Sequence, residues 1–288
     1  SSMKLPRLIA LGIATAFSMQ TPATFAQETA TSSANNSFGF KMLSVLKKSS
    51  KSDNLFISPL SISQALKMAL NGAGGKTKDQ MVATLELQKV ASNLVNKQDQ
   101  EMVKIITTPP TELIKQMKQY GGTGDPTFKL TVANSLWGNK NIVFNPSFIA
   151  NCTAAYNAEV RSMDFADPRT VSTINQWTSI RTAGKIPSII ARLTTQDLLV
   201  LLNAVYFKAA WKDEFRKEAT KPMAFLTASG SSKKVPTMNR QDHMSYLDAQ
   251  TFQMVGLPYA DNNTEMYVIL PKGKATVDSV LRGFTDTS

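Results

Sequence analysis

The spacing of hydrophobic residues predicts helices over much of the first half of the chain. The clearest begins at Ser58-Pro59, where the serine can cap a helix and the proline suits its first turn. Gly72 ends this helix, whose apolar residues recur at helical spacing: Ile62, Ala65, Leu66, Ala69 and Leu70. The run from Thr77 to Gln80 has the form of a capping box and predicts the start of the next helix. Further helices are expected over 37–48, over 97–106, after Asn145-Pro146, from Asp167-Pro168 to Ala183-Gly184, and over 276–284.

The second half of the chain is dominated by patterns typical of strands. Nine of the ten residues over 198–207 are apolar or aromatic, which predicts a central strand covered on both faces, with a buried helix as the competing interpretation. Before it, Phe128, Leu130 and Val132 alternate with polar residues, as in a half-buried strand. Four more strands are expected over 235–239, 244–247, 252–257 and 265–270, with a turn at 260–263.

Asn203 interrupts the most hydrophobic of these strands. A buried amide that lacks hydrogen-bond partners costs about 1–3 kcal/mol. We therefore expect Asn203 to belong to a satisfied polar cluster formed with residues from elsewhere in the chain.

Residues 1–26 have the pattern of a secretory signal peptide. Lys4 and Arg7 precede an apolar stretch over 8–17, which is too short to span a bilayer, and small residues Thr24 and Ala26 occupy the positions read for cleavage. A buried N-terminal helix is the alternative. We expect export to the periplasm or the extracellular space, with no membrane segment after removal of the signal, and a disordered lead-in over 27–36.

Composition excludes several function classes. The 288 residues are 42% hydrophobic, which is enough for a large core. Single cysteine and histidine residues, Cys152 and His243, exclude an internal disulfide and a histidine-rich metal site, and they disfavour a Ser–His–Asp hydrolase. The segment Gly75-Lys76-Thr77 lacks the glycine that a phosphate-binding loop needs at position 70. We expect no cofactor, no metal, no nucleic-acid partner and no enzymatic activity.

The net charge of +11 favours acidic partners. Lys104, Lys115 and Lys118 could form a weak polyanion site, and a solvated helix face is the simpler interpretation of the same residues.

Four blocks, in order and at consistent spacing, resemble the serpin family. They cover 54–66 with 71–80, 130–137, 202–211, and 235–238 through 266–273. The similarity extends from about Phe38 to the end of the chain. It implies an α+β fold with N-terminal helices packed on a large mixed main sheet, smaller antiparallel sheets beside it, and a partial serpin domain over 37–288.

The resemblance implies an inhibitor of serine or cysteine proteases that acts as a suicide substrate. In this family the protease attacks an exposed loop, and the cleaved loop then inserts into the main sheet as an extra strand. The resemblance places Ser58, Pro59, Ser61 and Asn203 in the shutter, a polar cluster beneath the sheet. It places Trp211 at the breach, where the loop first enters. Ordinary packing and capping is the alternative role for all of these residues.

Two departures from the family pattern bear on function. The first is mild: Ala209 stands where the family usually has glycine. The second is severe, because in the family several segments follow the position that corresponds to the end of this sequence. They are the hinge, the reactive loop with its scissile bond, two strands of the main sheet, two core strands of sheet B and the shutter histidine, which His243 lies in the wrong block to replace. We therefore expect a C-terminally truncated fragment that is inactive alone, monomeric or prone to aggregate through uncovered sheet edges. A non-inhibitory serpin acting as a binding or carrier protein is the second interpretation.

Overall fold

The computed structural model describes residues 29–50, 54–108, 119, 128–227, 230–261 and 263–285. Its helices are α1 (Ala30–Ser49), α2 (Pro59–Leu70), α3 (Gly75–Thr84), α4 (Ser92–Thr107), α6 (Pro146–Tyr156), α7 (Pro168–Arg181) and α8 (Val277–Thr285). Its strands are β1 (Phe128–Asn139), β2 (Glu159–Met163), β3 (Leu199–Ala209), β4 (Lys221–Leu226), β5 (Ser232–Thr237), β6 (Ser245–Asp248), β7 (Phe252–Pro258) and β8 (Glu265–Pro271).

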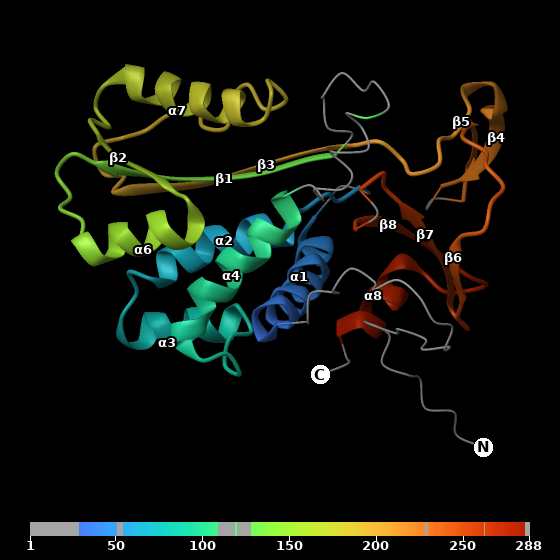
Figure 1. Cartoon of the computed structure of the whole chain (residues 1–288), viewed down its shortest axis with the longest axis horizontal. Coiled ribbons are helices and arrows are strands. Elements are labelled where there is room, and N and C mark those ends of the chain that lie inside the picture. The colour runs from blue at the N-terminus through green and yellow to red at the C-terminus, as the bar shows by residue number, and fades with distance from the viewer. Residues whose placement is uncertain are drawn as a thin grey trace.

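The main sheet has the strand order β2-β1-β3 and lies between two layers of helices (Figure 1). Strand β1 pairs in parallel with β2 and antiparallel with β3, in a register that runs from Phe128 opposite Ala209 to Gly138 opposite Leu199. Helix α7 covers one face, where Trp137, Ile174 and Trp177 form a buried core. Helices α2, α4 and α6 cover the other face (Figure 1). This architecture is the predicted α+β arrangement, with N-terminal helices packed on a mixed main sheet and smaller antiparallel sheets beside it.

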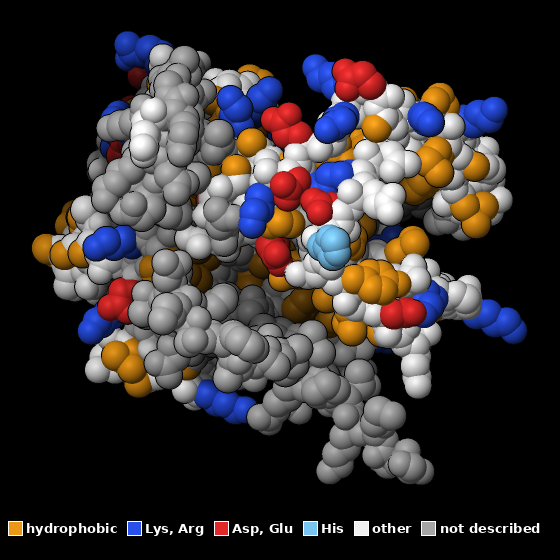
Figure 2. All heavy atoms as spheres, turned by 45° about the vertical axis from the view of Figure 1, so that its right-hand side comes forward, with side chains coloured by type: hydrophobic (Ala, Val, Ile, Leu, Met, Phe, Trp, Pro, Cys, Tyr) orange, Lys and Arg blue, Asp and Glu red, His pale blue; other side chains and the backbone are white. Residues whose placement is uncertain are grey.

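Two smaller antiparallel sheets lie at the other end of the molecule. They are the pair β4-β5 and the three-stranded sheet β6-β7-β8. Helix α8 packs against α1, and the rings of Phe40 and Phe284 stack there at 5.2 Å. Many apolar side chains of this end are exposed, as Figure 2 shows, and they include Met223, Phe225, Leu226, Tyr246, Met266, Tyr267, Val268, Ile269 and Leu270.

Local capping signals identify several helix starts correctly. The side chains of Asn145 and Asp167 accept hydrogen bonds from the backbone amides of Ser147 and Arg169, so that each caps the helix opened by the following proline. The strand predicted over 198–207 is confirmed as β3. The competing interpretation of a buried helix is wrong.

Strand β3 is covered on both faces as predicted, by α7 on one face and α2 on the other (Figure 1), but among the described strands it lies at the end of the sheet and not in its centre. Within the described residues β3 pairs with β1 alone, and Leu198 before it is 64% exposed. An apolar run indicates that both faces of a strand are covered, but it does not show which strands pair with its edges.

The N-terminal part of the described chain is more ordered than its composition suggests. Residues 30–36 belong to α1 and are not a disordered lead-in. Thr29 and Ser32 form a capping box at its start, and buried Thr31 donates its hydroxyl to Gln98 of α4 at 2.7 Å. Local capping and a long-range contact therefore overcome the polar composition. The predicted signal peptide over 1–26 lies outside the described residues.

Two details of the predicted helices are also corrected. Thr77 lies inside α3, which begins at Gly75, and does not cap it. In α2 the fully buried side chains include Gln64, Lys67 and Met68, whereas Ile62 and Leu66 are only partly buried. Among the residues that the structure describes, none of the helices combines the length and hydrophobicity that crossing a membrane requires.

Candidate functional site

A polar cluster joins α2 to the centre of the main sheet. Asn203 of β3 and Asn134 of β1 are register partners, and Asn203 Nδ2 donates to Asn134 Oδ1 at 2.5 Å. The Ser61 hydroxyl of α2 donates to Asn203 Oδ1. The prediction that Asn203 has hydrogen-bond partners is confirmed.

Asn134 extends this cluster to two more helices. Its Nδ2 donates to Gln64 Oε1 of α2 at 3.3 Å and to the backbone carbonyl of Tyr156, the last residue of α6, at 2.8 Å. Asn134 is buried, and it lies on the same face of β1 as Leu130 and Val132 because side chains alternate along a strand. Sequence reasoning missed Asn134, although a polar residue on an apolar strand face is the signal that identified Asn203.

Ser58 and Pro59 position α2 without joining the amide cluster. Ser58 is the N-cap by backbone geometry, and its carbonyl accepts the amide of Ile62 at 3.1 Å, but its side chain caps no backbone amide of α2. Pro59 packs against Gly39 of α1, where an added Cβ would lie 2.8 Å from the proline Cβ. Of the four predicted shutter residues, Ser61 and Asn203 therefore contact each other. Ser58 and Pro59 instead hold the start of α2 in position.

Trp211 lies in a stack of aromatic rings that joins the sheets. Its ring is parallel to that of Tyr259 at 4.6 Å, and backbone hydrogen bonds of 2.9 Å flank the contact on both sides. Tyr259 also meets Phe207 of β3 edge-on at 5.1 Å, and Phe215 meets Trp211 at 5.9 Å. The stack fixes the end of β3 against the strand pair β7-β8. The polar cluster and Trp211 are therefore two separate sites along β3.

A buried ion pair that the sequence does not reveal lies beyond the cluster on α2. Lys67 Nζ contacts Asp99 Oδ1 of α4 at 2.9 Å, and neither side chain has any exposed surface. Asn35 of α1 accepts a second hydrogen bond from Lys67 at 2.8 Å. Burial lowers the pKa of Lys67 and raises that of Asp99, and the attraction between the two groups opposes both shifts.

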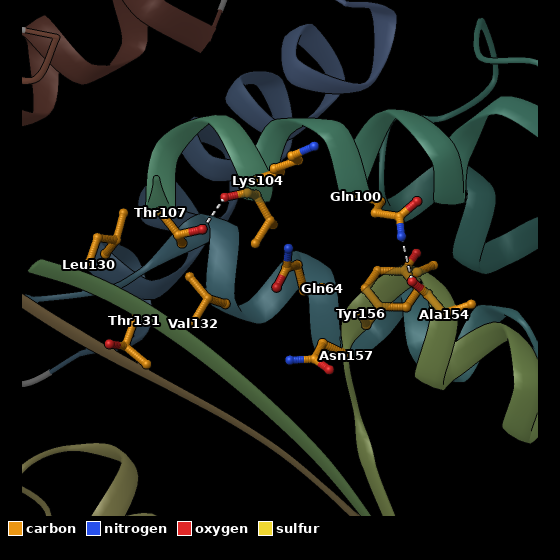
Figure 3. A pocket seen from close by; sticks show the side chains of 12 residues that line it. Gln64, Gln100, Lys104, Thr107, Leu130, Thr131, Val132, Ala154, Tyr156 and Asn157 are labelled. Carbon is orange, nitrogen blue, oxygen red and sulfur yellow. Dashed lines mark hydrogen bonds between the residues drawn. The ribbon is translucent and has the colours of Figure 1, made fainter. Parts of the chain in front are cut away.

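A cavity of about 410 Å³ opens beside the cluster (Figure 3). Its walls come from α2, α4, α6 and β1, and they include Gln64 and Tyr156. Lys104 lies on its α4 wall, whereas Lys115 and Lys118, the other two residues of the predicted polyanion site, lie outside the described residues.

The described residues bring together no set of groups suited to covalent catalysis or metal binding. Cys152 is buried, and burial raises its pKa to about 11, which suppresses the thiolate. His243 lies exposed in the loop before β6. No group of three or more histidine, cysteine, aspartate or glutamate side chains in the described ranges could hold a metal ion. The arrangement instead suits a conformational role, because its polar groups join strands to helices.

Comparison with known proteins gives a consistent result. The family model for "Serpin (serine protease inhibitor)" matches residues 33–288. Leukocyte elastase inhibitor of Sus scrofa is 33% identical over 246 residues, which cover 83% of this chain and 61% of that protein. The chain spans a similar share, 60%, of the human protein of the same name.

Solved structures of a thermophilic serpin, tengpin, share the fold. The latent form matches with a TM-score of 0.73 and 27% identity, over 89% of this chain and 65% of that one. The native form matches with a TM-score of 0.74 and 27% identity, over 89% and 62%. Overall similarity therefore does not distinguish the two states. Taken with the match over residues 33–288, the fold and the relatives establish that this chain belongs to the serpin family.

Proposed function

We propose that the protein of which these residues are part inhibits serine or cysteine proteases by inserting a cleaved loop beside β3. The observation that carries the proposal is that β3, whose Asn203 belongs to the cluster with Ser61 and Asn134, is the last described strand of its sheet. A strand at the end of a sheet can accept an added strand through the backbone amides and carbonyls on its outer side. In this proposal the cluster is the shutter, and the Trp211 stack is the breach where the strand enters.

We further propose that the 288-residue chain alone forms no inhibitory complex. The chain spans 61% of the pig inhibitor that it resembles. In the serpin family the reactive loop lies beyond the segments that the four blocks of this chain resemble. The test is to incubate the purified chain with trypsin, chymotrypsin, elastase and papain and to examine the products on denaturing gels. A complex that survives SDS with any of them would contradict this part of the proposal.

A chimera tests the inhibitory mechanism itself. Residues 29–285 would be joined to the C-terminal part of pig leukocyte elastase inhibitor that lies beyond the matched region, with the intact pig protein as the positive control. The expected result is an SDS-stable complex with elastase. A chimera that unfolds cooperatively and is cleaved without trapping elastase would contradict the proposal and favour a non-inhibitory serpin.

We also propose that residues 1–26 direct export, on the basis of their basic, apolar and small-residue regions. Fusion of residues 1–36 to a reporter enzyme that is active only outside the cytoplasm should give activity. Replacing Leu11 by Arg, which interrupts the apolar region, should abolish this activity. Activity that survives the replacement would contradict export by this segment.

A further inference from the structure

One stripe of polar side chains runs along the buried side of α2. Ser61, Gln64, Lys67 and Asn71, the residue that follows the helix, are three, three and four positions apart and therefore share one side. Ser61 and Gln64 contact the sheet cluster, whereas Lys67 and Asn71 contact the helical layer. The same helix thus binds the main sheet at one end and α4 at the other.

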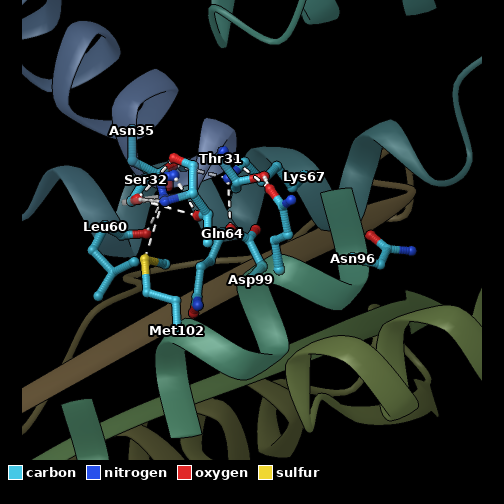
Figure 4. A network of polar contacts seen from close by, with 12 residues as sticks. Thr31, Ser32, Asn35, Leu60, Gln64, Lys67, Asn96, Asp99 and Met102 are labelled. Carbon is cyan, nitrogen blue, oxygen red and sulfur yellow. Dashed lines mark hydrogen bonds and ion pairs between the residues drawn. The ribbon is translucent and has the colours of Figure 1, made fainter. Parts of the chain in front are cut away.

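The ion pair in the helical half of this stripe is closed to solvent. Lys67 Nζ lies 2.9 Å from Asp99 Oδ1 and 2.8 Å from Asn35 Oδ1, which ties α2 to α4 and α1 at once (Figure 4). Asn71 and Asn96 exchange side-chain hydrogen bonds of 2.8 and 3.2 Å one turn away. Loss of one partner from a fully buried ion pair leaves an uncompensated charge, so this contact resists separation of α4 from α2.

A second route connects α4 to the cluster through α6. The Tyr156 hydroxyl donates to Asn96 Oδ1 of α4 at 2.8 Å, and the Tyr156 carbonyl accepts from Asn134 at 2.8 Å. Asn134 is thereby held from both sides, by Gln64 of α2 and by Tyr156 of α6. A displacement of α4 would disturb both supports of the amide that pairs with Asn203.

We propose that Lys67 and Asp99 form a latch through which α4 controls how tightly the polar cluster holds β1 and β3. When the latch is closed, α2 and Tyr156 keep Asn134 in place; when it opens, both supports loosen and the strand pair becomes more mobile at the cluster. The inference rests on the shutter role proposed above, but its test uses no protease, so the two can fail separately.

Hydrogen exchange in the full chain tests the latch. Lys67→Met keeps most of the side-chain volume and leaves Asp99 unpaired. Asn35→Ala is the milder variant, because it removes the hydrogen bond from Lys67 and a long one to Met102 Sδ at 3.7 Å but leaves both charges. It serves if Lys67→Met does not fold. The matched control is Lys140→Met, which breaks an exposed ion pair with Asp164 of 2.7 Å.

The readout is the exchange rate of backbone amides in four segments. Amides over 132–136 and 202–204 report on the cluster, and amides of α4 report on the latch. Amides of β7 report on global stability.

The expected result for Lys67→Met is exchange at least about tenfold faster in α4 and in both cluster segments, with β7 unchanged, because buried charge without a partner opens structure locally. Asn35→Ala should accelerate exchange in the same segments, but by a smaller factor. Lys140→Met should leave the exchange rates of these segments unchanged. Faster exchange confined to α4 would overturn the proposal, since the pair would then be a local contact. Equal acceleration in β7 would overturn it as well, since the effect would be global.

A second measurement probes the coupling directly. Lys67 is six residues from Ser61, about 9 Å along the helix axis, and substitutions so far apart are normally additive. In this proposal Asn35 acts on the cluster through Lys67 of the same helix as Ser61. The shift in urea midpoint of the Asn35→Ala/Ser61→Ala double variant should then differ from the sum of the two single shifts if the latch exists. Additive shifts would contradict it.

Discussion

Single amide side chains carry much of the connection between sheet and helices. Asn203 accepts from Ser61 and donates to Asn134, so its loss deprives two polar atoms of partners at once. Asn134 is buried and makes its remaining contacts to Gln64 and Tyr156. A buried polar group without a partner lowers stability by more than one hydrogen bond raises it. We therefore expect the stability of the fold to be sensitive to truncation of these side chains.

Replacing Asn203 by alanine should therefore destabilise the chain by about 1–3 kcal/mol. Ser61→Ala removes only one donor and should cost about 0.5–1.5 kcal/mol, the net worth of one hydrogen bond. Urea unfolding followed by circular dichroism measures both. If the serine variant is destabilised more than the asparagine variant, the cluster is not centred on Asn203.

At the scale of elements, the contact between α7 and β2 depends on one carboxylate. Glu159 Oε2 accepts from the Trp177 indole at 2.8 Å, and Arg161 and Arg181 lie beside the same carboxylate. Burial alone would raise the pKa of Glu159, but the Trp177 hydrogen bond and the arginine charges outweigh it, and the pKa is lowered.

The sign of this shift predicts a pH dependence. A carboxyl whose folded pKa is depressed stabilises the fold above its unfolded pKa of about 4.3, and that contribution is lost as pH falls through the folded value. Glu159→Gln should therefore be less stable than the parent near pH 7, and the gap should close on acidification. The measurement is the urea midpoint between pH 7 and pH 3, with Glu101→Gln on the exposed side of α4 as the control. A gap that does not narrow at all as the pH falls would show that the charge of Glu159 is not responsible.

The crossing of α1 and α2 leaves no space for a side chain at Gly39. A Cβ there would lie 2.8 Å from Cβ and 3.0 Å from Cγ of Pro59, and a proline ring cannot move aside. Gly39→Ala should cost about 1–3 kcal/mol through overpacking. Gly283 of α8, where an added Cβ meets nothing within 4 Å, is the matched control, and Gly283→Ala should stabilise by about 0.5–1 kcal/mol. Equal effects of the two substitutions on the unfolding midpoint would contradict the close approach.

An element can be predicted from sequence when the residues that determine it lie close together along the chain. A cap followed by proline acts within one turn, and the helices after Asn145 and Asp167 were therefore predictable. The partners of Asn203 could be expected as a class but not identified, since Asn134 lies 69 residues away. Lys67 gives no local sign of burial, because its stabilising partner Asp99 lies on another helix, 32 residues further along the chain.

At the scale of the whole molecule, two sheets end in strands without a covering partner among the described residues. Strand β8 is the edge of its sheet, and the consecutive apolar residues Met266 to Leu270 are all exposed. Strand β3 likewise lies at the end of the described main sheet, although most of its side chains are buried or partly buried. Exposed hydrophobic strand edges are templates for pairing with another chain.

We therefore expect the chain to self-associate, and β8 to be a principal contact. Leu270, which is 61% exposed, can be replaced by lysine with little effect on folding, and the added charge should reduce association because a charged edge opposes pairing. The control is Val45→Lys on α1, which adds the same charge at a side chain that is 64% exposed on a helix. Light scattering over a concentration series should show less association for the β8 variant than for the helix variant. Equal reductions would mean that net charge governs association and that the strand edge does not.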